Sequence, residues 1–263
     1  MNVLMWNERG ANKPNFQIFI RYMLKKFKTN ILALFEAHVG GDRAGRICQG
    51  LGFDNSFRVD AVGQSGGLWL LWRFGVGPVK VVEANNQFIY STVGEGTDIM
   101  HLVVVYTDPT VSRRSGLWDK LREMLHGILE PVVVGGDFNT ILRLDERTGG
   151  NGRVSLDSLA FGEWVNASSL TDMGFKGSKF TWRRGCVEST YVAKRLDRVF
   201  CNAHARLKWQ DALVLHLPFL ASDYAPLFLQ LSLEVEVDPR RRPFRFKTAL
   251  LQQESFKEML MNS

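Results

Sequence analysis

The chain has 263 residues, enough for one large domain or two, and its 45% hydrophobic and 23% charged residues are ordinary for a soluble globular protein. The formal net charge is +6, of which residues 240–263 hold +4, from six basic side chains against two acidic ones, so the preceding body holds only +2. So small an excess excludes a strongly basic body and is compatible with a polyanionic partner without demanding one.

The cysteines and the N-terminal residues indicate the cellular compartment in which we expect the protein. Cys48, Cys186 and Cys201 lie far apart, and they form neither a metal-ligand spacing nor an even-numbered disulfide framework. A strand begins at or near Met1 without a basic region leading into a signal-peptide core. No apolar run approaches the roughly 18 residues that a membrane span needs. We therefore expect a nuclear or cytoplasmic protein with no secretion signal and no membrane partner.

The N-terminal part of the chain reads strand, helix, strand. Residues 1–7 form an apolar strand, and a helix is expected from about Pro14, because aromatic and aliphatic residues then recur at helical spacing. Residues 31–35 are a short apolar run that predicts a buried strand and delivers Glu36 at its end. A short helix is expected over 43–51.

The remaining elements are mostly strands, with turn residues between them. A helix is expected over 112–129, because leucines recur there at every fourth position, and another over 155–167. We predict an α/β protein with two packed sheets flanked by helices, in a domain over 1–237 that is followed by a basic linker or arm over 238–263. The predicted strands cover 66–72, 79–82, 88–93, 99–106, 132–137, 178–183, 196–200, 212–217 and 225–233.

One stretch in the middle of the chain joins a buried strand to polar residues. Three consecutive valines, 132–134, are typical of a strand that is buried on both faces. Gly135 and Gly136 are expected to end this strand and to let the backbone turn. Asp137 and Asn139 then follow, as catalytic groups on a rigid base or as simple turn and cap residues. This stretch alone leaves both interpretations open.

Polar side chains recur at the ends of otherwise apolar strands, and neighbouring strands would bring them to one rim. Carboxylates, an amide and a phenol in one cleft suit Mg²⁺, which takes oxygen ligands and keeps several waters. No cluster of His and Cys offers a zinc site. The chemistry that fits is attack of water on a phosphodiester. The residues concerned are Asn7, Glu36, Tyr106, Asp137, Asn139, Thr181, Asp197, Ser222 and Asp223.

Each of these residues also has a simpler interpretation when it is taken alone. Glu36 could be a solvated strand-end residue, and Tyr106 an amphipathic tyrosine at the edge of the core. Thr181 could be no more than a strand former. Asp197 could pair with a neighbouring basic residue such as Arg195. Only their convergence on one rim favours the functional interpretation.

Seven short motifs occur in the order seen in the endonuclease/exonuclease/phosphatase superfamily. Within it, the chain resembles the endonuclease domain of plant LINE-type (non-LTR) retrotransposons over about residues 1–235. The basic stretch at 241–246 also resembles the connector that leads to the reverse transcriptase in those elements. The motifs are WNERG at 6–10, the strand ending at Glu36, VY at 105–106, GDFN at 136–139, FTW at 180–182, RLDRVF at 195–200 and SDYAPL at 222–227.

The resemblance implies a DNase-like fold, a four-layer sandwich of two mixed sheets faced by helices, and a magnesium-dependent site. Glu36 is similar to the principal Mg²⁺ ligand, with Mn²⁺ as an alternative ion, and Asn7 and Asp223 lie beside the metal. Asp137 resembles the residue that orients and deprotonates the attacking water. Asn139 corresponds to the residue that steadies this water or the phosphate.

The resemblance also implies contacts with DNA. Tyr106 would hydrogen-bond a phosphate oxygen as charge develops there. Thr181, Ser222 and Arg9 are the expected substrate-binding side chains, and Asp197 is similar to the carboxylate that orients a histidine. Arg9 stands where some DNA-repair relatives carry an acidic metal ligand, which argues against specificity for abasic sites.

The family's histidine after Asp223 is Tyr224 in this chain. A carboxylate-held histidine can be a cation near neutral pH, whereas a tyrosine, with a reference pKa of about 10, stays neutral. Loss of a positioned acid–base group typically costs on the order of 10²–10⁴ in rate. His216 lies nearby but precedes the strand turn, so we assign it to the scaffold.

The sequence therefore predicts a monomeric, magnesium-dependent endonuclease of retrotransposon type that nicks one strand of duplex DNA and is impaired at Tyr224. Two alternatives stay open. One is a catalytically inactive relic of a retroelement that still binds nucleic acid. The other is a small-molecule phosphatase on the same fold, for example one that acts on phosphoinositides.

Overall fold

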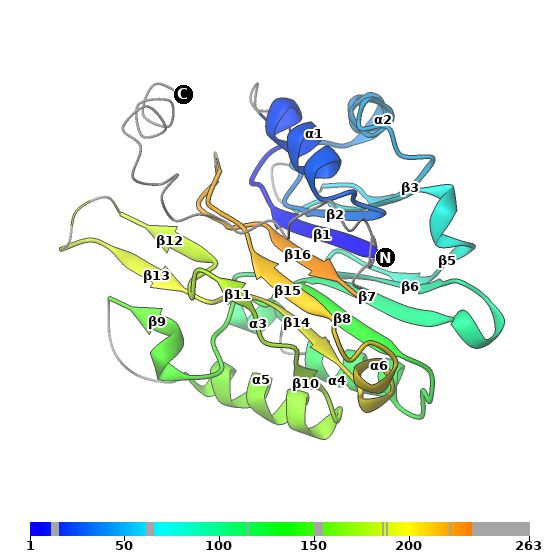
Figure 1. The fold of residues 1–263 in the computed structure, drawn as a ribbon. Coiled ribbons are helices and arrows are strands. Elements are labelled where there is room, and N and C mark those ends of the chain that lie inside the picture. Colours follow the sequence, from blue (N-terminus) through cyan, green and yellow to red (C-terminus); the bar gives the residue numbers. More distant parts are fainter. Residues whose placement is uncertain are drawn as a thin grey trace, which may run out of the picture. The chain divides into compact units, whose positions relative to one another are not determined.

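The computed structural model describes residues 1–232 apart from 12–15, 62–65, 115, 150–154, 186, 188 and 221 (Figure 1). The basic arm expected over 238–263 lies outside the described residues, so the boundary of the two predicted domains stays a prediction. No helix in the described part of the chain is long and apolar enough to cross a membrane. Two of the three cysteines, Cys48 and Cys201, are buried free thiols.

Among the described residues the first sheet has seven strands, which include the parallel pair β1 (Asn2–Asn7) and β2 (Ile31–Phe35). Strands β1 and β2 run in the same direction because the chain crosses between them through helix α1 (Phe16–Lys26). The order across the sheet is β11 (Lys176–Gly177), β15 (Leu213–His216), β16 (Leu227–Gln230), β1 (Asn2–Asn7), β2 (Ile31–Phe35), β4 (Leu68–Trp72) and β3 (Asn55–Val59).

In the part of the chain that the structure describes, the second sheet has six strands and a small third sheet has three. The parallel neighbours β7 (Met100–Tyr106) and β8 (Val132–Asp137) form the middle of the second sheet, with helix α4 (Leu117–Leu125) between them in the sequence. The order is β10 (Thr171–Asp172), β14 (Asp197–Cys201), β8 (Val132–Asp137), β7 (Met100–Tyr106), β6 (Phe88–Val93) and β5 (Val79–Ala84). The third sheet is β12 (Trp182–Arg184), β13 (Val192–Lys194) and β9 (Arg147–Thr148).

Successive side chains along a strand point to opposite faces of its sheet, and each face packs against a different layer of the sandwich. In β1, Val3 and Met5 face the second sheet, whereas Leu4 and Trp6 face α1 and the helix α2 (Gly41–Gly50). Helices α4 and α5 (Leu156–Ala167) cover the outer face of the second sheet (Figure 1). The predicted four-layer sandwich of two mixed sheets faced by helices is confirmed.

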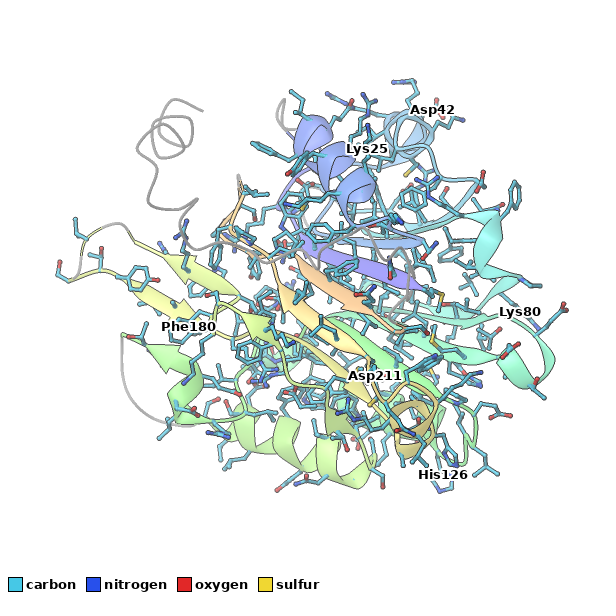
Figure 2. All side chains as sticks on the ribbon, in the orientation of Figure 1. Lys25, Asp42, Lys80, His126, Phe180 and Asp211 are labelled. Carbon is cyan, nitrogen blue, oxygen red and sulfur yellow. The ribbon has the colours of Figure 1, made fainter. Side chains whose placement is uncertain are left out.

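Several charged side chains lie on the outside of this sandwich (Figure 2). Lys25 on α1, Asp42 on α2, Lys80 on β5 and Asp211 before β15 are all exposed. The remaining short elements are the helices α3 (Val111–Arg114) and α6 (Ala203–Lys208) and the 3₁₀ turns η1 (Phe74–Val76), η2 (Gly96–Asp98) and η3 (Leu144–Glu146).

Some sequence predictions about elements are wrong in detail. The single helix expected over 112–129 is two helices, α3 (Val111–Arg114) and α4, with Gly116 as the N-cap of α4. Helix α4 ends at Leu125, shortly before Gly127, whose φ is +75°. The strand expected over 178–183 begins only at Trp182. Strand β3 was missed, because its polar residues hide the alternation at the edge of the first sheet.

The two glycines of the central stretch have a different role from the one expected. They do not end the strand, since β8 continues through both of them to Asp137. A Cβ on Gly136, whose φ is +141°, would lie 2.0 Å from the backbone oxygen of Val105 on β7. A Cβ on Gly135 would lie 2.6 Å from the sulfur of Met5 in the other sheet. Close backbone approach of β7 therefore requires glycine at position 136, whereas Gly135 leaves room between the sheets for the Met5 side chain.

Candidate active site

The ends of two parallel strand pairs bring the predicted residues to one edge. Asn7 is the last residue of β1 and is paired with Phe35, the last residue of β2, so that Glu36 follows directly. In the second sheet Tyr106 ends β7 and is paired with Asp137, the end of β8. Carboxyl ends of parallel strands meet at the same edge, which is where α/β proteins commonly bind ligands.

Two buried hydrogen bonds join the two sheets at this edge. The Asn7 amide donates from Nδ2 to Oδ2 of Asp137 over 3.0 Å. The Tyr106 hydroxyl donates to Oε1 of Glu36. Burial and the negative charge of Glu36 raise the pKa of the Tyr106 hydroxyl, which therefore stays protonated and remains a donor. Each sheet thus contributes one carboxylate and one neutral partner to a single cluster.

Asp137 is fully buried and held by further hydrogen bonds. The backbone N–H of Asn139 donates to its Oδ1 over 2.9 Å, and Asn139 is itself fixed, with a φ of +47° and its Nδ2 donating to the Thr107 carbonyl over 2.7 Å. Burial raises the pKa of Asp137 to about 6, although the hydrogen bonds from Asn139, Asn7 and Tyr224 act to lower it. A buried carboxylate with a raised pKa is suited to accept a proton from water.

Asp197 stands opposite Asp137 in the antiparallel pair of β14 and β8. The Thr181 hydroxyl accepts hydrogen bonds from the backbone N–H groups of Leu196 and Asp197 over 2.9 and 3.0 Å, and Thr181 is fully buried. Burial and then the charge of Asp137 raise the pKa of Asp197 well above its usual range. Its Oδ2 is buried without a hydrogen-bond partner. In this structure Thr181 supports Asp197, and its contact with DNA stays a prediction.

A buried network of ion pairs holds β14 in place beside Asp197. Arg195 and Arg198 both bind Asp172, over 2.8 and 2.9 Å, and Arg198 also binds Glu146. The side chain of Arg198 is completely buried. The simpler interpretation, in which Asp197 pairs with Arg195, does not hold, because this arginine is committed to Asp172.

The segment around Tyr224 is pinned to the end of β1. The Ser222 hydroxyl donates to the Asn7 carbonyl over 3.1 Å and accepts from the backbone N–H of Tyr224, and the Trp6 indole donates to the Tyr224 carbonyl over 3.1 Å. Tyr224 is buried, and its side chain hydrogen-bonds Asp137. Burial and then the charges of Asp137 and Asp197 raise the pKa of Tyr224 far above its usual range, so this side chain stays neutral.

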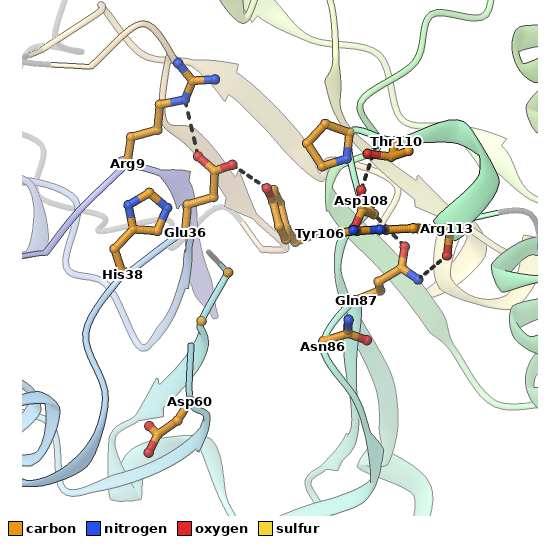
Figure 3. Close-up of a pocket in the computed structure, with 13 residues that line it drawn as sticks. Arg9, Glu36, His38, Asp60, Asn86, Gln87, Tyr106, Asp108, Thr110 and Arg113 are labelled. Carbon is orange, nitrogen blue, oxygen red and sulfur yellow. Dashed lines mark hydrogen bonds and ion pairs between the residues drawn. The ribbon is translucent and has the colours of Figure 1, made fainter. Parts of the chain in front are cut away.

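A cleft of about 920 Å³ opens beside Glu36 (Figure 3). Arg9 reaches over this cleft and binds Oε2 of Glu36 from Nε over 3.2 Å and Oδ2 of Asp223 over 2.6 Å. Arg9 and Glu36 both adopt left-handed backbone conformations, with φ of +52° and +53°, which is uncommon for residues with long side chains and is frequent at functional sites. The far wall is formed by Asn86, Gln87, Asp108, Pro109, Thr110 and Arg113.

The structure therefore brings all the predicted site residues into one connected cluster, and their roles stay predictions. His216 belongs to the scaffold: its Nδ1 lies 2.6 Å from the Ser178 carbonyl oxygen, its ring stacks on Phe175, and burial lowers its pKa to about 4. The sequence did not reveal the far wall of the cleft. The available signals were the paired asparagines at 85–86 and Asp108, which follows closely after Tyr106.

The donor set fits a divalent cation of the magnesium type. Asn7 Oδ1 is buried at the site without a hydrogen-bond partner, and the Glu36 carboxylate lies on the neighbouring strand end. Among the described residues no group of three or more His, Cys, Asp or Glu side chains is placed to hold a metal ion. Mg²⁺ typically takes one or two carboxylates and keeps several waters, so a pair of protein ligands is sufficient.

We expect Asp137 to titrate near pH 6 in the metal-free protein. Because its folded pKa lies above the unfolded value of about 3.9, its contribution to stability is present below pH about 4 and is lost as the pH rises through 6. Carbon-13 NMR of the side-chain carboxyl groups, with Asp137→Asn for assignment, measures this pKa. A pKa in the ordinary aspartate range would contradict the expectation.

Several solved structures of known proteins have a fold similar to that of this chain. A 3' phosphatase from Neisseria bound to a product DNA hairpin is 16% identical and aligns over 88% of this chain and 99% of its own, with a TM-score of 0.67. The endonuclease domain of TRAS1, a telomere-specific non-LTR retrotransposon, is 14% identical and aligns over 89% of this chain and 99% of its own, with a TM-score of 0.66. An AP endonuclease from Archaeoglobus fulgidus is 12% identical and aligns over 88% of this chain and 99% of its own, with a TM-score of 0.68. At such identities the likeness shows the fold alone.

A search of curated proteins gives no match. The model of the Endonuclease/Exonuclease/phosphatase family, in contrast, matches residues 2–223. This match covers most of the chain and includes the strand ends, the buried carboxylates and the segment that reaches Asp223. The chain belongs to the endonuclease/exonuclease/phosphatase family.

Proposed function

We propose that this chain is a divalent-metal-dependent phosphodiesterase that nicks one strand of duplex DNA, an endonuclease of the retrotransposon type whose rate is limited by Tyr224. The observation that carries the proposal is the buried Asp137 carboxylate, with its raised pKa and its hydrogen bonds from Asn7 and Asn139, beside Glu36 at the edge where both sheets end. A base, a pair of hard oxygen ligands and an open cleft are what hydrolysis of a phosphodiester requires.

Each side chain has a definite task in this proposal. Asp137 accepts a proton from the attacking water, and Asn139, fixed by Thr107, orients that water. Glu36 and Asn7 would hold Mg²⁺ or Mn²⁺, which would neutralise charge on the phosphate when bound. The Tyr106 hydroxyl orients Glu36 by its hydrogen bond and can also turn to a phosphate oxygen.

The leaving oxygen is the weak point of the site. As the bond from phosphorus to the leaving oxygen breaks, that oxygen gains negative charge and needs a proton or a charged donor. Tyr224 supplies only a neutral hydroxyl, since burial and two carboxylates hold its pKa high. Asp197, which the resemblance assigns to orienting a histidine, has no hydrogen-bond partner at Oδ2. The proposal therefore predicts slow cleavage that leaves a primer end.

DNA as the substrate is supported by several features together. One structural neighbour is bound to a product DNA hairpin, and another is a retrotransposon endonuclease domain. The cleft is lined by Glu36, Arg9 and Arg113 among others, and the two arginines can meet phosphate groups. Localisation in the nucleus or cytoplasm and a monomeric state remain predictions.

Tyr224→His is expected to raise the nicking rate on the order of 10²–10⁴-fold, because an imidazole beside Asp137 and Asp197 would carry a charge and donate to the leaving oxygen. Conversion of supercoiled plasmid to nicked circles in Mg²⁺ measures the rate. Tyr224→Phe is the matched control: it keeps the ring and removes the hydroxyl, so it should not exceed the wild type. Equal rates for the His and Phe variants would contradict the assigned defect.

A second candidate is a catalytically inactive relic that binds DNA, and the neutral Tyr224 is the observation that favours it. Under this reading the wild type and Tyr224→His both fail to nick plasmid, whereas an electrophoretic mobility shift shows binding to duplex DNA. Release of inorganic phosphate from inositol phosphates in the same samples, without nicking, would instead identify a small-molecule phosphatase.

A further inference from the structure

Arg9 forms an ion pair of a different kind from those of Arg114 and Arg198, because it lies at the wall of the open cleft and not in the interior. The side chains of Arg114, on Asp157, and Arg198, on Glu146, are 4% and 0% exposed, so these pairs are part of the interior. The Arg9 side chain is 42% exposed and lines the open cleft. An ion pair at a cleft wall can open without disturbing the fold, whereas opening a buried pair leaves uncompensated charge.

The partners of Arg9 are the charged members of the predicted metal-ligand set. Its Nε donates to Glu36 Oε2 and its guanidinium reaches Asp223 Oδ2, at 3.2 and 2.6 Å. The other oxygen of Glu36 accepts from Tyr106. The neutral ligand, Asn7 Oδ1, has no partner. Arg9 thus holds the charged part of the donor set and leaves the uncharged part open.

The charge on Arg9 is permanent. Although burial acts to lower it, the pKa of Arg9 is raised by Tyr224, Asp223 and Glu36. The guanidinium also lies 5.3 Å from the centre of the Tyr224 ring. A divalent ion that approaches Glu36 therefore meets a fixed positive charge, which no change of pH in the working range removes.

We propose that Arg9 is an internal counter-ion that competes with a divalent cation for Glu36 and Asp223, so that cation binding displaces its guanidinium into the open cleft. This inference rests on the proposed function, since it takes the site to bind a divalent cation. The displaced guanidinium then faces the space in which a phosphate would lie, and its planar fork can bind phosphate oxygens. The cation and Arg9 exchange places, so that Glu36 always faces a positively charged group, either the guanidinium or the divalent ion.

Titration of the full chain with Mn²⁺ by isothermal calorimetry tests this competition without any need for catalysis. Arg9→Gln is expected to bind Mn²⁺ on the order of tenfold more tightly than the wild type, because two partly exposed ion pairs no longer oppose the ion. Arg9→Lys should fall between them, since lysine keeps the charge without the fork. Arg122→Gln is the matched control: it also removes an exposed arginine from an ion pair, with Asp119 over 2.6 Å, but Arg122 does not line the cleft, and this variant should match the wild type.

Glu36→Gln identifies the site, because Mn²⁺ binding that depends on this cluster must be lost in it. Unchanged or weaker Mn²⁺ binding in Arg9→Gln overturns the inference. If circular dichroism shows that Arg9→Gln does not fold, Arg9→Lys is compared with the wild type instead. Tighter Mn²⁺ binding by Arg9→Lys supports the inference, and unchanged or weaker binding overturns it. Absence of Mn²⁺ binding in every variant overturns both this inference and the proposed function. Tighter binding in Arg9→Gln without nicking by any variant leaves the inference standing and overturns the proposed nicking activity alone.

Discussion

Asp137→Asn is expected to lower the nicking rate on the order of 10²–10⁴-fold, because it removes the carboxylate that accepts the proton from water. The amide is nearly isosteric, but its NH₂ group would face the Asn7 amide, which donates to Asp137 Oδ2 over 3.0 Å in the wild type. One hydrogen bond is therefore lost together with the base. The effect is best measured in the Tyr224→His background, where the starting rate is expected to be higher.

Asp211→Asn is the matched control, because this aspartate is exposed on the surface and belongs to no part of the site (Figure 2). Its nicking rate should stay within about twofold of the parent, as surface substitutions usually cause little change. Thermal melting of both variants separates loss of chemistry from loss of fold. A rate for the Asp137 variant equal to that of the control would mean that another group takes the proton.

Gly136→Ala is expected to cost about 3 kcal/mol or more of unfolding free energy, the upper part of the range for overpacked cores. The new Cβ would lie 2.0 Å from the Val105 backbone oxygen, and β7 cannot retreat because Val105 and Gly136 are paired in a parallel ladder. A φ of +141° adds strain for any residue with a Cβ. The midpoint of urea unfolding, followed by circular dichroism, measures the loss.

The neighbouring Gly135→Ala provides the comparison. Its Cβ would meet the Met5 sulfur and methyl carbon at 2.6 and 2.8 Å, which are the far end of a flexible side chain. Methionine can adopt another rotamer, so we expect a smaller loss of about 1–2 kcal/mol. Equal losses for the two alanine variants would show that the backbone contact with Val105 is not what demands glycine at position 136.

The fold and the membership of the site were largely predictable from the sequence, because both depend on local patterns. Buried strands leave a clear signal as runs of branched apolar residues, and the residue that follows each run marks the sheet edge. Asn7, Glu36, Tyr106 and Asp137 were found in this way, and the structure joins them by hydrogen bonds across the sheets. Their chemical roles stay predictions.

Features that depend on tertiary packing could not be predicted. Arg9 follows β1 closely and Asp223 lies more than two hundred residues later, so no local pattern announces their ion pair. Gly136 looked like a turn residue, because the close approach of β7 is invisible in the sequence. The sequence suggested an ion pair between Arg195 and Asp197, but in the structure Arg195 pairs with Asp172 of β10.

The division of the site between two sheets has a consequence for how the protein can vary. Asn7 and Glu36 lie on one sheet, and Tyr106 and Asp137 lie on the other. The position of each side chain in the site therefore depends on the register of its strand. A slip of one residue along a strand moves a side chain by about 3.3 Å and turns it to the opposite face. Changes at the interior surface between the sheets, far from any solvent, should therefore disturb the chemistry before they unfold the chain.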